Sequence, residues 1–192
     1  MQPLIDNART FGRRPEEFAR LAEGQSPQVL FITCSDSRVV PALITGARPG
    51  ELFELRTAGN IVPPYAPDRP TGEAATIEYA VEVLGVRDVV VCGHSHCGAV
   101  GALVRGDDLD AVPAVRDWLT RAAPRPQGGA GDPAVAEGVQ GHVLAQLLRL
   151  RSYPCVAAKL ADGRLTLHGW YYEVHTGAVL AHRPQTDSFT AL

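Results

Sequence analysis

Short apolar segments alternate with amphipathic segments along most of the chain. Three segments rich in β-branched and aromatic residues, at 28–33, 51–56 and 87–92, are bounded by proline, glycine or polar residues, and this pattern predicts buried strands. Between the second and third segments, apolar residues at helical spacing predict a helix over 71–84, which Gly85 ends. Strands that alternate with helices indicate an α/β fold with a mainly parallel central sheet flanked by helices.

The second half of the chain continues this alternation. Helical patterns cover residues 110–122 and 134–150, and the prolines and glycines at 123–133 between them predict a surface loop. A late strand over 165–174 turns into another over 178–182. A chain of 192 residues is long enough for one well-buried core and short for two. We therefore expect residues 1–192 to form a single domain.

The first 24 residues differ from the rest. Pro15-Glu16-Glu17 opens a helical pattern with proline and acidic residues in its first turn, and Gly24 ends it. Charged residues interrupt every apolar run in this segment, so it does not fit a signal peptide, and no run elsewhere reaches the length of a membrane span. We expect a helical arm at 1–24, an α/β core at 25–192 and a cytoplasmic protein without a membrane partner.

Composition and charge narrow the function classes. The formal net charge is −3 and like charges do not form long runs, so the sequence gives no basis for a nucleic-acid partner. The chain has four cysteines. Without an export signal they are expected to be reduced thiols or metal ligands rather than disulfides.

Three potential metal ligands follow the ends of two predicted strands. Cys34 follows the first strand, and His94 and Cys97 follow the third. The carboxyl ends of parallel strands meet at one edge of a sheet, where ligand sites form in open α/β folds. Two thiolates and an imidazole suit Zn²⁺, and three protein ligands leave a fourth position open, as in catalytic zinc sites. The sequence therefore predicts one zinc ion per chain.

Three motifs around these residues carry a family resemblance. Cys34-Ser35-Asp36-Ser37-Arg38, Arg56-Thr57-Ala58-Gly59-Asn60 and Gly93-His94-Ser95-His96-Cys97-Gly98 resemble, in order and spacing, the signature segments of β-class carbonic anhydrases with a plant-like site pattern. The resemblance implies a lyase that reversibly hydrates carbon dioxide to bicarbonate and a proton. It implies zinc ligation by Cys34, His94 and Cys97, with a zinc-bound hydroxide as the nucleophile.

The resemblance also implies roles for residues around the metal. Asp36 and Arg38 match the family's catalytic pair, in which the carboxylate accepts a hydrogen bond from the hydroxide and the guanidinium holds the carboxylate. The residues that match the carbon dioxide pocket are Gln25, Phe53, Ala58, Tyr79 and Gly98.

The family's assembly leads to a further expectation. In the family the zinc ligands come from one chain and much of the pocket from its neighbour, which implies a homodimer or a higher even oligomer. Gln25, Phe53 and Tyr79 would then serve the zinc of the partner, and the arm at 1–24 would be exchanged between subunits.

A regulatory pocket of some bacterial members has no full counterpart. That pocket binds bicarbonate away from the zinc through a tryptophan, an arginine and a tyrosine, and the matching positions here are Phe31, Arg56 and Tyr172. Without the indole N–H the anion loses a donor. We therefore expect no allosteric inhibition of this kind.

Two other functions fit the same ligands. A hydrolase of carbonyl sulfide or carbon disulfide would use the same zinc chemistry on a sulfur analogue, with the pocket shape deciding the substrate. A non-catalytic zinc module would have Asp36 filling the fourth position permanently. Arg38 argues against this module, because a partner for the carboxylate allows the metal to stay open. His96 is expected to be exposed or bonded to backbone, and Cys92 and Cys155 to be unligated thiols.

Overall fold

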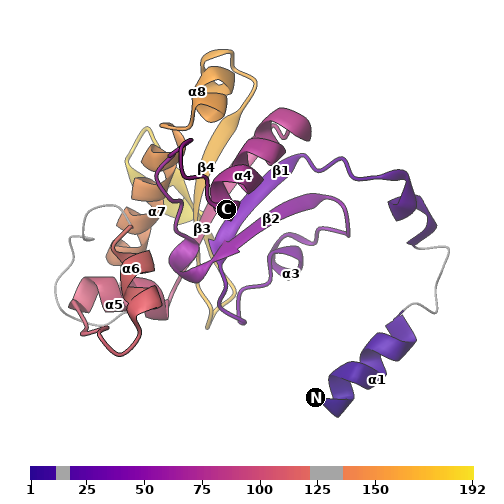
Figure 1. The fold of residues 1–192 in the computed structure, drawn as a ribbon, viewed down its shortest axis with the longest axis horizontal. Helices are drawn as coiled ribbons and strands as arrows, with labels where there is room; N and C mark the ends of the chain where they lie inside the picture. The colour runs from indigo at the N-terminus through magenta and orange to yellow at the C-terminus, as the bar shows by residue number, and fades with distance from the viewer. Residues whose placement is uncertain (12–17, 122–135) are drawn as a thin grey trace.

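The computed structural model describes residues 1–11, 18–121 and 136–192. Within these ranges the central sheet has six strands in the order β2-β1-β3-β4-β5-β6 (Figure 1). Neighbouring strands among the first four are parallel, whereas β5 and β6 pair antiparallel. The predicted mainly parallel α/β sheet is thus confirmed. The strand bounds are β1 Val29–Cys34, β2 Leu52–Thr57, β3 Asp88–His94, β4 Thr166–Tyr172, β5 Val179–Arg183 and β6 Ser188–Ala191.

Helices lie between the strands and ahead of them. The α-helices are α1 Gln2–Phe11, α3 Pro41–Thr45, α4 Gly72–Glu78, α5 Gly98–Arg105, α6 Pro113–Leu119, α7 Ala136–Leu150 and α8 Pro154–Ala161. Short 3₁₀ turns form η1 Ala19–Glu23 and η2 Ala58–Asn60, and η3 Tyr79–Val83 is a π-helical turn.

The larger hydrophobic core lies between one face of the sheet and helices α4, α7 and α8. Its members are buried apolar side chains of the strands and helices, among them Leu30, Ile32, Val89, Val91, Ile77, Val143 and Val156. Gly93 lets α7 approach β3 closely, because a Cβ at this position would lie 2.7 Å from side-chain atoms of both Val139 and Val143. The last residues of β3 are therefore held firmly beneath α7.

The opposite face of the sheet carries a smaller cluster. Phe31, Val90 and Cys92 are buried there, with Trp170 and Tyr172 packed beside them. The rings of Phe31 and Trp170 meet edge to face, with centroids 5.8 Å apart. Cys92 is buried and Cys155 lies at the start of α8, and neither forms a disulfide.

The helix predicted over 71–84 begins as expected and ends differently. The Thr71 side chain accepts a hydrogen bond from Ala74 N at 3.2 Å, which caps α4. The predicted regular α-helix becomes a π turn at η3, where Leu84 N donates to Tyr79 O. π turns are rare and occur often at functional sites. Gly85 follows with φ of 66°, a left-handed conformation that glycine tolerates.

Other elements differ in extent from their predictions. β3 runs two residues beyond the predicted strand, so that His94 ends the strand itself rather than lying in the loop. The helix predicted at 110–122 is shorter in the structure and forms α6, while Ala122 and the predicted loop at 123–133 lie outside the described residues. Local patterns did not predict α3 or β6, whereas α1 lies within the predicted helical arm at 1–24.

The N-terminal segment is exposed. In Figure 1, α1 lies apart from the sheet, and none of its residues is buried. Leu4, Ile5 and Phe11 present apolar side chains to solvent. The predicted helix start at Pro15-Glu16-Glu17 lies outside the described residues, and the part that follows is the 3₁₀ turn η1.

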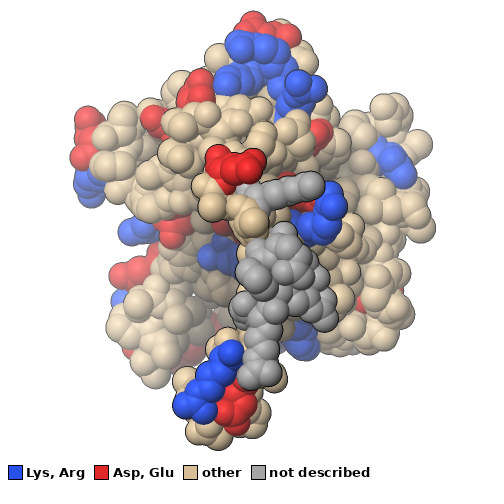
Figure 2. Space-filling view, turned by 90° about the vertical axis from the view of Figure 1, so that its right-hand side faces the viewer, with Lys and Arg blue, Asp and Glu red and all other residues tan. Residues whose placement is uncertain are grey.

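The distribution of charge and the hydropathy of the helices agree with what the sequence composition suggests. Acidic and basic side chains are interspersed over the face shown in Figure 2. In the parts of the chain that the structure describes, no helix combines the length and the apolar character needed to cross a membrane.

Candidate metal centre

Cys34, His94 and Cys97 converge at the carboxyl edge of the sheet. Cys34 is the last residue of β1 and His94 the last residue of the neighbouring β3, and Cys97 immediately precedes α5. One ligand atom from each of the three buried residues lies within 4.8 Å of the others. The two sulfur atoms are 3.9 Å apart. The parallel register of β1 and β3 thus brings together residues that are sixty positions apart in the sequence.

The ring of His94 is oriented as in a metal ligand. Its Nδ1 donates to the carbonyl oxygen of Ser95 at 2.9 Å, which leaves the lone pair on Nε2. Nε2 is buried and has no hydrogen-bond partner. A buried nitrogen without a partner is costly in a folded protein, whereas a metal ion would satisfy it. The donor set of one imidazole and two sulfurs therefore fits a zinc ion.

The two thiols affect one another strongly. A hydrogen bond from Cys97 lowers the pKa of Cys34, and Gly59 N–H lowers it further. The same interaction, together with burial, raises the pKa of Cys97 well above its usual range. Two buried sulfurs at this distance resist ionising together unless a cation balances their charge. A divalent metal would provide that charge.

Asp36 and Arg38 form a rigid pair beside this cluster. Arg38 donates from Nε to Oδ1 at 2.9 Å and from Nη2 to Oδ2 at 2.7 Å, and its backbone N–H also donates to Oδ1. Asp36 Oδ2 lies 3.9 Å from His94 Nε2. The guanidinium holds the pKa of Asp36 far below its usual range, so the carboxylate is ionised at the edge of the cluster.

Backbone carbonyls hold the pair and its loop. Arg38 Nη2 also donates to the carbonyl of His96 at 3.0 Å, and His96 itself is exposed with a φ of 57°. Arg56 Nη2 donates to the carbonyls of Cys34, Asp36 and Val39 at 3.0, 2.9 and 2.7 Å. The role of Arg56 in shaping this loop was not predicted, because a strand residue that bonds to a distant loop leaves no local sequence signal.

Two of the predicted pocket residues border the cluster. Ala58 follows the end of β2, and the next residue, Gly59, donates its N–H to Cys34 Sγ at 3.4 Å. Gly98 follows Cys97 as the first residue of α5. The first N–H groups of an α-helix have no acceptor inside the helix, so the N–H of Gly98 is available to an external oxygen.

Gln25, Phe53 and Tyr79 lie away from the cluster of their own chain. Phe53 is paired with Leu30, four residues before Cys34, which corresponds to about 13 Å along the strand. The rings of Phe53 and Tyr79 are in contact, with centroids 5.9 Å apart. Tyr79 is 44% exposed, and Gln25 is exposed ahead of β1.

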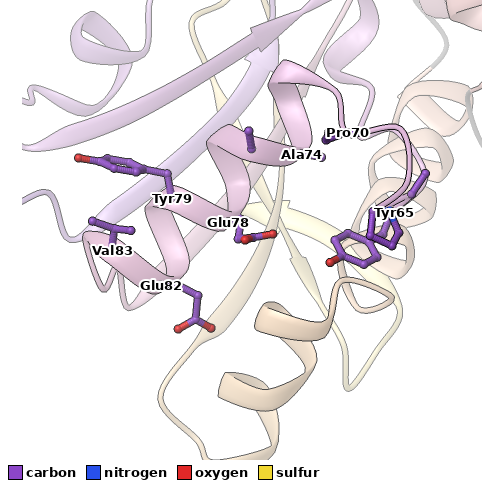
Figure 3. Close-up of a pocket in the computed structure, with 10 residues that line it drawn as sticks. Tyr65, Pro70, Ala74, Glu78, Tyr79, Glu82 and Val83 are labelled. Atoms are coloured by element: carbon purple, nitrogen blue, oxygen red, sulfur yellow. The ribbon is translucent and has the colours of Figure 1, made fainter.

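Tyr79 also lines a surface pocket of about 440 Å³ between α4, η3 and the segment 65–70. Figure 3 shows Tyr79 and Val83 on one side of the helix formed by α4 and η3, and Tyr65 on the opposite side of the pocket from this helix. Glu78 and Glu82 add two carboxylates to the lining. This surface is open to solvent, in contrast to the buried cluster.

The fold and the cluster together define an α/β protein with a Cys-His-Cys site for a metal ion at the carboxyl edge of its sheet. A family model described as carbonic anhydrase matches residues 29–179. A carbonic anhydrase of Pseudomonas aeruginosa is 48% identical over 203 residues, which cover 100% of this chain and 92% of that protein.

Solved structures agree with this match. The β-carbonic anhydrase CcaA superposes with a TM-score of 0.92 at 38% identity, covering 100% of this chain and 99% of its own. One of two tetrameric β-carbonic anhydrases from Sordaria macrospora gives a TM-score of 0.74 at 29% identity, covering 94% and 92%. The chain belongs to the β-carbonic anhydrase family, and the predicted resemblance is confirmed.

Proposed function

We propose that this chain binds one zinc ion through Cys34, His94 and Cys97 and reversibly hydrates carbon dioxide to bicarbonate and a proton. The observation that carries the proposal is the buried, unpartnered Nε2 of His94 beside two sulfurs, with an ionised carboxylate 3.9 Å away. Zinc, when bound there, supplies a Lewis acid that lowers the pKa of a coordinated water to roughly 7.

Asp36 orients the attacking water. Arg38 keeps the carboxylate ionised, so the carboxylate accepts a hydrogen bond from the water and fixes its orientation without taking its proton. Attack forms a bond between the water oxygen and the carbon of carbon dioxide, and the π pair of one carbon–oxygen double bond moves to its oxygen. One proton of the water is released to solvent, so bicarbonate and a proton result. The N–H of Gly98 can donate to the oxygen on which negative charge develops.

The same pair argues against a non-catalytic zinc module. Such a module requires Asp36 to occupy the fourth metal position. Both carboxylate oxygens are already bonded to Arg38, and Oδ1 also accepts the backbone N–H of residue 38. Moving the carboxylate onto the metal would break part of this arrangement, so Arg38 favours a site that stays open to substrate.

The active unit that we propose is a homodimer with two shared sites. Tyr79 is 44% exposed and contacts the half-buried Phe53. This aromatic pair lies distant from the cluster of its own chain, as expected for residues that complete the site of a partner. The exposed apolar side chains of α1 would be covered if this helix packs on the neighbouring subunit.

The cysteines support the cytoplasm as the location that we propose. Two of them are the proposed zinc ligands and the other two are free thiols, and a reducing compartment keeps all four out of disulfides.

Stopped-flow measurement of carbon dioxide hydration by zinc-loaded protein tests the proposal. We expect hydration far above the buffer rate, rising from mildly acidic to alkaline pH. Carbonyl sulfide is the matched substrate, since both molecules are small, linear and uncharged. Fast hydrolysis of carbonyl sulfide with only background hydration of carbon dioxide would assign the chain to the sulfur hydrolases, and background rates on both would support the non-catalytic module.

A further inference from the structure

A single peptide unit connects Trp118 to the metal cluster. The N–H of Gly59 donates to Cys34 Sγ at 3.4 Å. The carbonyl of Ala58 belongs to the same peptide unit and accepts a hydrogen bond from Trp118 Nε1 at 2.8 Å. Trp118 lies on α6, sixty residues along the chain, and packs beside the buried Leu119 and Ile61. The indole thus contacts the peptide from the side opposite the sulfur.

The next peptide unit is held from α7. His142 Nε2 donates to the carbonyl of Gly59 at 2.8 Å, and His142 is buried. Burial lowers the pKa of this histidine, which keeps the ring neutral. Gly59 has φ of 75°, and a Cβ there would lie 3.2 Å from Ala99 Cβ. The backbone at Gly59 is therefore fixed by glycine geometry and by donors on both sides.

We propose that Trp118 and His142 are positioning residues of the metal centre, which hold the Gly59 N–H against the sulfur of Cys34. The bond from Trp118 to the Ala58 carbonyl polarises the peptide that carries the Gly59 N–H and strengthens this N–H as a donor. The bond from His142 to the Gly59 carbonyl fixes the orientation of the next peptide. That donor withdraws charge from the thiolate, which reduces donation from sulfur to the metal and leaves the metal a stronger Lewis acid. The inference rests on the metal site of the proposed function and is independent of its substrate.

Trp118→Phe removes the indole N–H and keeps an aromatic ring in the same place. In cobalt-substituted protein we expect the sulfur-to-cobalt charge-transfer band to move to longer wavelength, because the thiolate becomes a stronger donor. We also expect about tenfold weaker zinc binding in competition with a chelator, because Cys34 loses a contact that positions it as a ligand and this loss outweighs the stronger donation from sulfur. The midpoint of the pH profile of hydration should rise. Trp170→Phe removes the other indole of the chain, which packs against Phe31, and should change none of these values.

His142 offers a conservative pair of variants. His142→Leu removes the donor to Gly59 O, whereas His142→Gln retains a donor of similar reach. We expect the cobalt band of the leucine variant to move in the same direction as that of Trp118→Phe, and the glutamine variant to lie nearer to wild type. Equal losses of stability in both variants, with an unchanged band, would indicate a structural role only and overturn the proposal.

NMR of wild-type protein loaded with cadmium-113 tests the contact without substitution, should a variant not fold. The amide proton of Gly59 should resonate downfield and couple to cadmium through the sulfur. Absence of both signs would overturn the proposal. A shifted cobalt band in protein that does not hydrate carbon dioxide would leave the positioning role standing and remove the proposed function. Normal hydration of carbon dioxide with an unshifted cobalt band in Trp118→Phe would leave the proposed function standing and overturn the positioning role.

Discussion

The residues expected to form the active site fall into two groups that differ in burial and in their position along the sheet. The first group is buried or tightly bonded at the carboxyl edge of the sheet and consists of Cys34, Asp36, Arg38, His94 and Cys97. The second group is exposed or half-exposed nearer the amino ends of β1 and β2 and consists of Gln25, Phe53 and Tyr79.

The difference indicates which part of the site one chain can build alone. The metal ligands need only the register of β1 and β3, which a single chain supplies. Phe53 and Tyr79 contact each other and lie away from the Cys34, His94 and Cys97 cluster of their own chain. Aromatic residues that are exposed on a subunit and matched to a site elsewhere are typical of interfaces. One chain thus provides the metal centre, and we propose that its partner provides much of the pocket.

Removal of a metal ligand is expected to have the largest effect. Cys34→Ala, His94→Ala and Cys97→Ala each delete one of three donors, so zinc content should fall from one per chain to near zero and activity should fall with it. Metal analysis after dialysis, together with stopped-flow assays, measures both. Leu148→Ala, at an exposed position on α7, is the control and should retain full zinc. Full zinc retention in all three ligand variants would refute the assignment.

Loss of Arg38 is expected to separate catalysis from metal binding. Arg38→Ala should lower kcat by about 100-fold while zinc stays bound, because the variant frees the Asp36 carboxylate and the His96 carbonyl but removes no metal ligand. Wild-type kinetics in this variant would contradict the role of the pair.

The pH dependence of Asp36 follows from the same contact. Its folded pKa lies below the unfolded value, so its contribution to stability is complete above the unfolded pKa and is lost as the pH falls toward the folded one. Without Arg38 the pKa of Asp36 should return toward its usual range. Acid unfolding of Arg38→Ala should therefore show less dependence on this carboxylate, measured by circular dichroism across acidic pH.

Substitutions in the second group should lower the efficiency with which substrate is used and should not change the zinc content. Phe53→Ala and Tyr79→Ala should lower kcat/KM by about tenfold with zinc content unchanged, since both remove apolar pocket surface. Leu148→Ala again serves as the surface control. Loss of zinc in Tyr79→Ala would show that this residue supports the metal centre of its own chain, contrary to the comparison.

The sequence was enough to predict that Cys34, His94 and Cys97 converge at one edge of the sheet, but it did not predict the residues that support them. Cys34, His94 and Cys97 follow β-branched runs that end at polar residues, so local pattern and parallel topology were enough to place them at one edge. Trp118 and His142 act on Ala58 and Gly59 through contacts between elements far apart in the chain. Such bonds depend on how α6 and α7 pack, which no local periodicity encodes. The only sequence signal was a histidine within the apolar pattern of α7.

Irregular backbone features also could not be predicted from local sequence patterns. The π turn at η3 interrupts the predicted α-helix after Glu78 and includes the bond from Leu84 N–H to the Tyr79 carbonyl. Lys159 donates to the Val81 carbonyl within this turn at 2.6 Å, a tertiary contact that the helical periodicity of 71–84 does not reveal. β6 is a short edge strand whose pairing with β5 depends on the preceding turn.

The smallest expected effect concerns bicarbonate. Two of the residues that match the regulatory pocket make other contacts in this chain. Phe31 is fully buried against Trp170, and Arg56 donates to three backbone carbonyls. We expect simple, non-cooperative inhibition by bicarbonate at every pH tested. A sigmoidal inhibition curve in steady-state assays would contradict this expectation.

Subunit complementation tests the central claim most directly. A hybrid dimer is purified with two affinity tags from one chain carrying Cys34→Ala and another carrying Phe53→Ala and Tyr79→Ala. If the pocket serves the partner's zinc, one of its two sites combines an intact metal centre with an intact pocket, and the hybrid should show about half the wild-type rate. If each pocket serves its own chain, no site is complete, and the hybrid should be no more active than the impaired parents.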